Sequence, residues 1–291
     1  MRTHRIKVAV LLTGAAFMLS ACNANRYAKT NRVYKKQINA LTEQIRQPLP
    51  YITPRLITTY DTSGVAVVSE DPQAKNPEHW VGAIHFNLRK PNYVVIHHTA
   101  QDSLQQTLHT FTVPHTQVSS HYVIGRDGEI VQMLNDYVRG WHAGAGKWGS
   151  VTDLNSVSLG IELDNNGSEP FSEAQIHSLL NVLDTLKTKY NIPTANFIAH
   201  SDIAPTRKVD PSAFFPWKRL AESGFGYWPG DSLANPPEHF NPVDALRIIG
   251  YDTSNLEAAI RAFKLHYIQH DVSAVLTEDD ICVLYDLYLN Y

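Results

Sequence analysis

Two histidines and one aspartate, far apart in the chain, are the residues best able to do chemistry together. His97 ends the apolar run at residues 93–96, and His200 ends another at residues 197–199. Each run is typical of a short buried strand that carries a histidine at its tip. The Pro-containing loop after His200 returns a carboxylate at Asp210. Two imidazoles and a carboxylate, with a fourth position open, are the ligands of a catalytic zinc, so we expect one Zn²⁺ per chain.

The spacing alone does not decide for zinc, because the ligands are distant in sequence and a lone histidine is more often structural. Lys208 and Asp210 follow the second strand-end histidine closely, and this favours a site over two unrelated structural histidines. Neighbouring residues on a strand point to opposite faces, so we do not expect His98 to share a metal with His97.

The segments around these histidines predict the α/β scaffold that must hold them. Two apolar runs flank Asp127-Gly128, a pair typical of a β-hairpin turn. Ser172 is expected to begin the clearest helix, with Gln175 completing a capping box, and residues 191–193 end it. Mixed helices and strands with a hairpin among them predict a mixed β-sheet flanked by helices. A further helix is expected at residues 103–110, and strands at residues 121–124, 130–133 and 157–163.

Composition predicts flanking parts on either side of a main domain at residues 91–224. Residues 22–90 predict a polar tether, with a short helix around residues 35–45, and then an irregular arm rich in proline. Residues 225–241 are rich in Gly, Pro and Asn and predict a linker. Residues 242–291 predict a small unit of three helices. So short a segment forms only a marginal core alone, so we expect it to pack on the main domain, with ligand binding as the alternative.

Residues 1–21 have the features of a bacterial lipoprotein signal peptide. Three basic residues precede an apolar stretch over residues 8–19, which is too short to span a bilayer as a helix but fits a signal peptide. Leu-Ser-Ala-Cys at residues 19–22 resembles the lipobox, so we expect Cys22 to carry acyl chains such as palmitate. An ordinary signal peptide with an incidental cysteine is the alternative. By resemblance to lipoprotein sorting, Asn23 implies an outer-membrane lipoprotein on the periplasmic face of a Gram-negative bacterium.

Charge and cysteine content limit the classes of partner. The formal net charge is −3, and without the three basic residues of the signal peptide 22 Lys and Arg face 28 Asp and Glu, a net charge of −6. Nucleic-acid binders show a basic footprint, so no nucleic-acid partner is expected. With Cys22 lipidated, Cys282 has no partner in the chain, and its apolar neighbours predict a buried thiol. We expect a monomer.

Five motifs in sequence order resemble those of a known family. Taken together they are similar to the zinc-dependent N-acetylmuramoyl-L-alanine amidases of the amidase-2 type, which are related to peptidoglycan recognition proteins. The resemblance covers roughly residues 91–220. With its lipobox and C-terminal helices, the whole chain resembles the outer-membrane lipoprotein amidases of enterobacteria. The motifs are Ile-His-His-Thr-Ala at residues 96–100, Ser-His-Tyr at 120–122, Trp-His-Ala-Gly at 141–144, Ser-Leu-Gly-Ile-Glu-Leu at 158–163 and the highly specific His-Ser-Asp-Ile-Ala-Pro-x-Arg-Lys-x-Asp-Pro at 200–211.

The resemblance implies a role for each matched residue. His97, His200 and Asp210 match the zinc ligands. Glu162 matches the catalytic acid, which would take a proton from the zinc-bound water and pass it to the leaving amine. Lys208 matches the residue that stabilises the oxyanion. Without the resemblance, Glu162 reads as a salt-bridged strand carboxylate and Lys208 as a solvated loop lysine.

Other polar residues near these motifs receive lesser roles. His142, Asn165 and Arg207 are expected to line a substrate groove. Support of the site is the alternative for His142, turn chemistry explains Asn165 equally well, and a structural pair is the alternative for Arg207. His121 is expected to be structural, and Asp202 to cap the turn of the ligand loop.

The activity that the resemblance implies is hydrolysis of the amide between N-acetylmuramic acid and L-alanine in peptidoglycan or muropeptides. The C-terminal unit is similar, more weakly, to three-helix peptidoglycan-binding domains. One rival interpretation is a non-catalytic peptidoglycan-binding module on the same fold, but a pure binder needs none of Asp210, Glu162 and Lys208. The second rival is a zinc peptidase that cuts within the stem peptide.

Overall fold

The computed structural model of the chain describes residues 27–46, 56–60, 62–70, 85, 88 and 90–291. The predicted signal peptide and Cys22 therefore lie outside the described residues. The chain divides into two compact units, Met1–Asn87 and Leu88–Tyr291. No helix among the described residues is long and apolar enough to cross a membrane.

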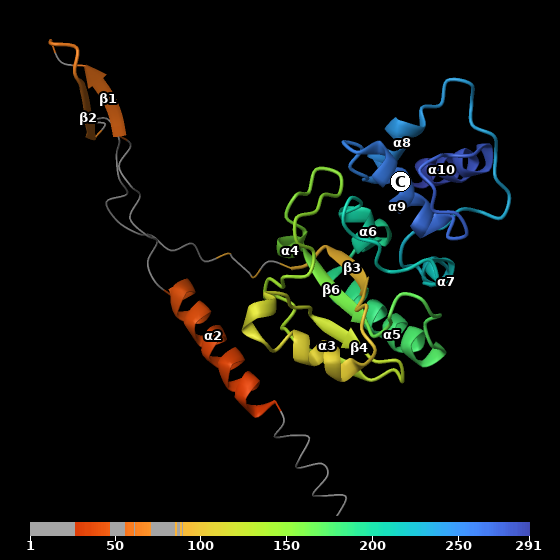
Figure 1. Cartoon of the computed structure of the whole chain (residues 1–291), viewed down its shortest axis with the longest axis horizontal. Coiled ribbons are helices and arrows are strands. Elements are labelled where there is room, and N and C mark those ends of the chain that lie inside the picture. The colour runs from red at the N-terminus through yellow and green to blue at the C-terminus, as the bar shows by residue number, and fades with distance from the viewer. Residues whose placement is uncertain (1–26, 47–55, 61, 71–84, 86–87, 89) are drawn as a thin grey trace, which may run out of the picture. The chain divides into compact units, whose positions relative to one another are not determined.

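Within the first unit, the described residues form one helix and one hairpin (Figure 1). Helix α2 spans Ala28–Arg46, longer than the helix expected around residues 35–45, and none of its residues is buried. Strand β1 (Leu56–Tyr60) pairs antiparallel with β2 (Ala66–Glu70). The prediction of an irregular arm is therefore wrong for this stretch, where Gly64, at a φ of 80°, lies in the turn between two strands with β-branched residues.

The second unit is built on a five-stranded mixed sheet in the order β5-β4-β6-β3-β7 (Figure 1). Strands β4, β6, β3 and β7 run parallel, and β5 pairs antiparallel with β4 through the predicted hairpin. The predicted fold class is therefore confirmed. Ile96 pairs with Ala199, so the parallel strands bring His97 and His200 to the same edge of the sheet. The strands are β3 (Tyr93–His98), β4 (Tyr122–Ile124), β5 (Ile130–Gln132), β6 (Ser158–Leu163) and β7 (Phe197–Ala199).

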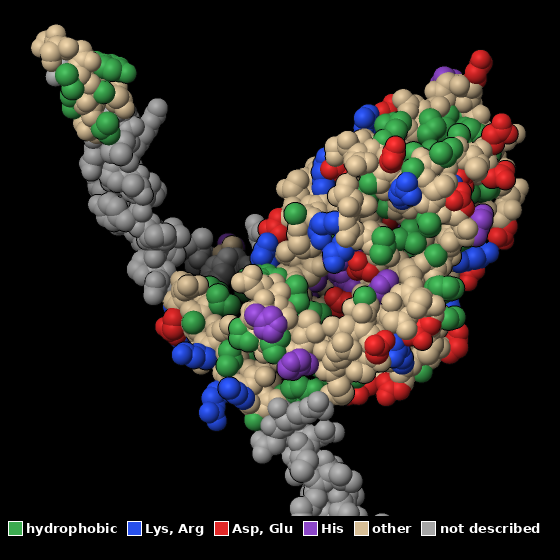
Figure 2. All heavy atoms as spheres, in the orientation of Figure 1, with side chains coloured by type: hydrophobic (Ala, Val, Ile, Leu, Met, Phe, Trp, Pro, Cys, Tyr) green, Lys and Arg blue, Asp and Glu red, His purple; other side chains and the backbone are tan. Residues whose placement is uncertain are grey.

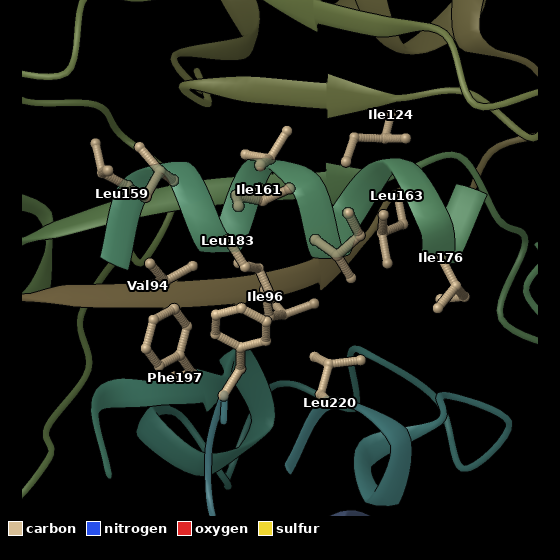
Figure 3. Packing of buried hydrophobic residues seen from close by; sticks show 14 of the residues in the cluster. Val94, Ile96, Ile124, Leu159, Ile161, Leu163, Ile176, Leu183, Phe197 and Leu220 are labelled. Atoms are coloured by element: carbon tan, nitrogen blue, oxygen red, sulfur yellow. The ribbon is translucent and has the colours of Figure 1, made fainter. Parts of the chain in front are cut away.

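The strand residues alternate between two apolar cores, and this alternation places the site. Val94 and Ile96 belong to the core under the long helix α5 (Figure 3), whereas Val95 belongs to the second core. Because side chains alternate with a period of two, His97 and Glu162 lie on the face of Val95. The remaining helices of this part are α3 (Leu104–Thr110), α4 (Leu154–Val157), α5 (Glu173–Tyr190), α6 (His200–Ile203) and α7 (Trp217–Glu222), with 3₁₀ turns at Pro114–Thr116 and Thr194–Asn196.

The start of α5 corrects one prediction. Ser172 is the N-cap as expected, and its hydroxyl accepts from the backbone N–H of Gln175 at 3.1 Å. The side chain of Gln175 does not complete a capping box. It is buried and donates to the backbone carbonyls of Ile124 and Asp164 at 2.9 and 3.1 Å. Gln175 thus ties α5 to the ends of two strands, because a buried amide must find partners wherever it lies.

The C-terminal unit packs as three helices on the main domain: α8 (Pro242–Ile249), α9 (Leu256–Tyr267) and α10 (Glu278–Asn290). Leu246, Phe263 and Leu284 share the second core with Val95 and Ile198. The expected packing is therefore confirmed, and residues 88–291 form one compact unit.

Cys282 departs from its prediction. It lies on α10 and is half-buried rather than buried, with its Sγ 3.6 Å from Asn235 Oδ1. The apolar run that predicted a buried thiol presents other residues to the core, among them Leu284.

Candidate active site

The three predicted ligands converge on one point at the carboxyl edge of the sheet. His97 Nδ1 lies 2.9 Å from His200 Nδ1 and 3.1 Å from Asp210 Oδ2, and His200 Nδ1 lies 3.0 Å from the same oxygen. All three residues are buried. Near its middle, the face of the globular part seen in Figure 2 is hollowed, and histidine and acidic side chains gather there.

These distances fit a metal ion. Bonds of about 2.0–2.1 Å to a tetrahedral zinc place neighbouring ligand atoms about 3.3 Å apart. Burial, followed by the nearby His200, lowers the pKa of His97 to about 4, so its imidazole is neutral at pH 7 and can ligate. Burial alone would raise the pKa of Asp210, but the His200 and His97 imidazoles outweigh this effect and hold it below its usual range. The donor set is therefore two imidazoles and one carboxylate.

Each histidine is oriented by a hydrogen bond from its other ring nitrogen. His200 Nε2 donates to the carbonyl of Ala143 at 3.2 Å, which leaves Nδ1 as the free lone pair. His97 Nε2 lies 3.2 Å from His142 Nδ1, and His142 Nε2 lies 3.4 Å from the hydroxyl of Ser158. The Ser158 hydroxyl donates to the carbonyl of Leu154 at 2.5 Å. This hydrogen-bonded chain ends on an acceptor, so it sets the tautomer of each ring and leaves the lone pair of His97 Nδ1 facing His200 and Asp210.

The loop at residues 141–145 contacts both histidines of the triad, and two other residues, Asn155 and Arg207, hold the loop. Asn155 Oδ1 accepts from the backbone N–H groups of His142 and Ala143 at 3.0 and 2.9 Å. Arg207 donates to the carbonyls of Ala143 and Ala145. A Cβ at Gly160 would overlap the His142 ring, so strand β6 needs glycine where the ring crosses it.

Glu162 and Lys208 lie beside the ligands. Glu162 is opposite His97 in the pairing of β3 with β6 and is half-buried. Burial, and then the charge of Asp210, raises the pKa of Glu162 to about 8, and Lys208 opposes this rise. Lys208 is half-buried, and its positive charge also lowers the pKa of His97. A half-buried carboxyl of raised pKa beside a lysine side chain can exchange a proton with water and stabilise an oxyanion.

Comparison with known proteins identifies the family. Residues 87–213 match the family model described as N-acetylmuramoyl-L-alanine amidase. The chain is 35% identical to the N-acetylmuramoyl-L-alanine amidase AmiD of Escherichia coli (strain K12) over 207 residues, which are 60% of this chain and 74% of AmiD. The chain belongs to the N-acetylmuramoyl-L-alanine amidase family. The family resemblance predicted from the motifs is therefore confirmed.

Other members of this amidase family are also similar. The 1,6-anhydro-N-acetylmuramyl-L-alanine amidase AmpD of Enterobacter cloacae is 39% identical over 108 residues, which are 37% of this chain and 58% of AmpD. A solved complex of E. coli AmiD with anhydro-N-acetylmuramic acid-L-Ala-D-γ-Glu-L-Lys matches with a TM-score of 0.62 at 27% identity, covering 80% of this chain and 97% of AmiD. AmpDh3 of Pseudomonas aeruginosa shares the fold, with a TM-score of 0.64 at 24% identity over 77% of this chain and 99% of AmpDh3.

The structure shows the hydrogen-bond partners of the three residues that were expected to line a groove. Asn165 is 1% exposed, and its amide is used within its own turn, where Oδ1 accepts from Gly167 at 2.7 Å and Nδ2 donates to the carbonyl of Glu169 at 3.1 Å. Asn165 therefore does not line a groove. His142 and Arg207 support the ligands from behind, as described above. The amide of Asn165 is thus part of a turn, whereas His142 and Arg207 contact the residues of the triad and the loop beside them.

Two other expectations agree with the structure, and some supporting residues went unnoticed. His121 is structural: its Nδ1 accepts from Gly160 N–H at 3.1 Å and its Nε2 donates to the carbonyl of Val138 at 2.9 Å. His98 points away from the triad, and its Nδ1 accepts from Ser212 N–H at 3.1 Å. Sequence reasoning missed Asn155 and Ser158. Only a glycine inside the apolar strand, at 160, signalled that another group approaches the backbone there.

Proposed function

We propose that this amidase hydrolyses the amide between the lactyl group of N-acetylmuramic acid and L-alanine, on peptidoglycan or muropeptides, with one zinc ion per chain. The supporting observation is the meeting of His97, His200 and Asp210 within 3.1 Å, with Glu162 opposite His97 on the next strand. The similar AmiD was solved with a muramyl peptide whose amide is of this type.

His97, His200 and Asp210 hold the metal in this proposal. A zinc ion bound there supplies a Lewis acid and lowers the pKa of a bound water. The ligand set has one negative charge, so the bound cation keeps a net positive charge that favours this chemistry.

Glu162 and Lys208 carry the proton and the charge. As a carboxylate, Glu162 accepts a proton from the attacking water and then donates it to the departing amine of L-alanine. Burial raises the pKa of Glu162, which suits the second half of this task, because a carboxyl that is too acidic returns its proton poorly. Lys208 places an ammonium beside the carbonyl oxygen as negative charge develops on it.

Product analysis by mass spectrometry separates this proposal from its two rivals. The substrate is anhydro-N-acetylmuramic acid-L-Ala-D-γ-Glu-L-Lys. An amidase releases the whole peptide with a free L-alanine amine and leaves the muramic acid with a free carboxylate. A peptidase leaves L-alanine on the muramic acid, and a binding module leaves the substrate unchanged. Either of the last two results contradicts the proposal.

The proposed organisation follows the predicted boundaries: a signal peptide at residues 1–21, a lipidated Cys22 with a tether to residue 90, an amidase domain at 91–224, a linker at 225–241 and the helical unit at 242–291. Acyl chains on Cys22 anchor a monomer to the outer membrane, facing the periplasm. Cys22→Ser releases the protein from membranes in this view, while the matched control Cys282→Ser stays bound. A Cys22→Ser protein that still sediments with membranes contradicts the anchor.

A further inference from the structure

A second buried carboxylate lies two residues after the metal ligand His200. Asp202, on α6, is 0% exposed and belongs to no metal-ligand group among the described residues. Its Oδ2 accepts from the backbone N–H of Ala199 at 2.8 Å, so it caps the turn of the ligand loop as predicted. A carboxylate removed from water needs more than one such partner.

The other partners of Asp202 come from the C-terminal helical unit. Tyr251 donates its hydroxyl to Asp202 Oδ1 at 2.9 Å. His266, on α9, places Nδ1 2.8 Å from Oδ2. Both are buried, at 2% and 3% exposure, and the His266 ring stacks on Trp217 with the ring centres 3.8 Å apart. Asp202 therefore receives three hydrogen bonds, two of them from side chains beyond the linker, and bonds to a carboxylate are the stronger kind.

The capped turn is the one that presents His200. Helix α6 has only four residues and begins with His200. The N–H that Asp202 holds belongs to Ala199, directly before the ligand. Ser201, the residue directly after His200, donates its backbone N–H to the backbone carbonyl of Asp210 at 2.9 Å. A shift of Asp202 would therefore move the backbone under two of the three ligands.

We propose that Asp202, Tyr251 and His266 form a positioning cluster through which the C-terminal helical unit sets the geometry of the metal site. The cluster rests on the proposed zinc site, since without a metal it has nothing to position. Metal sites need their ligands held to within about 0.5 Å, and a four-residue helix cannot supply that rigidity alone. The helical unit is thus a support of the active site, whether or not it also contacts murein.

The test compares two single-hydroxyl deletions in the full chain. Tyr251→Phe removes one bond to Asp202. Tyr267→Phe is the matched control, because Tyr267 is also buried in the second core, at 4% exposure, and its hydroxyl pairs with Tyr291 at 3.1 Å. Zinc affinity is measured by competition with a chelator, ligand geometry by the visible spectrum of the cobalt-substituted protein, and stability by urea unfolding without metal.

Tyr251→Phe should weaken zinc binding by about tenfold, the lower range for loss of an outer-shell partner, and should change the cobalt spectrum. Tyr267→Phe should lose about as much stability as Tyr251→Phe. Its zinc affinity should stay within about twofold of wild type, and its cobalt spectrum should be unchanged. Equal zinc affinity and identical spectra in both variants would overturn the proposal, and so would equal losses in both. A wild-type protein that binds no zinc instead refutes the proposed function, and the positioning role falls with it.

Discussion

Replacing Glu162, the proposed base, with glutamine should make the zinc-free amidase more stable. The same substitution should abolish most of the activity of the zinc-bound enzyme. Burial raises the pKa of Glu162 from its ordinary 4.5 to about 8. The folded protein therefore keeps this proton to higher pH than the unfolded chain does. By linkage, the folded state loses stability as the pH rises from about 4.5 to about 8. Glu162→Gln removes the ionisation, so the variant escapes that loss.

The expected gain in the free energy of unfolding follows from the change in the pKa of Glu162 on folding. A change from 4.5 to about 8 corresponds to about 5 kcal/mol at 1.36 kcal/mol per pKa unit. Glu162 is only half-buried, and water screens its charge, so we expect Glu162→Gln to unfold with about 2–4 kcal/mol more free energy than wild type at pH 8. At pH 4.5 and below, where the wild-type carboxyl is protonated in the folded state, the difference should nearly vanish.

Urea unfolding of zinc-free protein at several pH values between 4.5 and 8 measures this difference. Glu129→Gln, on the exposed hairpin, controls for the loss of a carboxylate from the surface. With zinc bound, turnover of Glu162→Gln should fall by about 10²–10⁴-fold at unchanged zinc content. A stability difference that does not grow with pH would refute the raised pKa of Glu162. Unchanged turnover would refute its role as the general base.

Four further outcomes test other parts of the site. His200→Ala should lose zinc and turnover together, measured by metal analysis and product release; a variant with full zinc content contradicts the ligand assignment. Lys208→Ala should lower kcat by about 10²–10³-fold, whereas an effect on KM alone would make Lys208 a substrate-binding residue. Gly160→Ala should weaken zinc binding in a chelator competition, because the new Cβ would overlap the His142 ring. Unchanged zinc affinity would mean that His142 does not orient His97. Truncation after Pro237 should lower solubility and thermal stability, because it uncovers the second core; a stable, zinc-loaded fragment that merely sediments less with murein would make the tail a targeting module.

Local sequence signals were sufficient for the strands of the main sheet and for the meeting of His97, His200 and Asp210. The apolar runs before His97 and His200 have the length and composition of buried parallel strands, and parallel strands must end at one edge of the sheet. Any side chain at their tips is then brought to that edge. The cap at Ser172 also follows from residue type, since its side chain bonds within the next turn.

The tertiary structure decided which distant side chains meet. Gln175 has the spacing of a capping box, yet the sheet carbonyls that α5 covers take its amide instead. His142 supports His97 only because Gly160 lets the ring lie against β6. Asp202 caps its own turn, as its sequence position predicts, but its pairing with Tyr251 and His266 depends on how the three C-terminal helices dock. Periodicity determines the face on which a side chain lies, whereas its partner across that face is chosen by packing between segments that no local pattern relates.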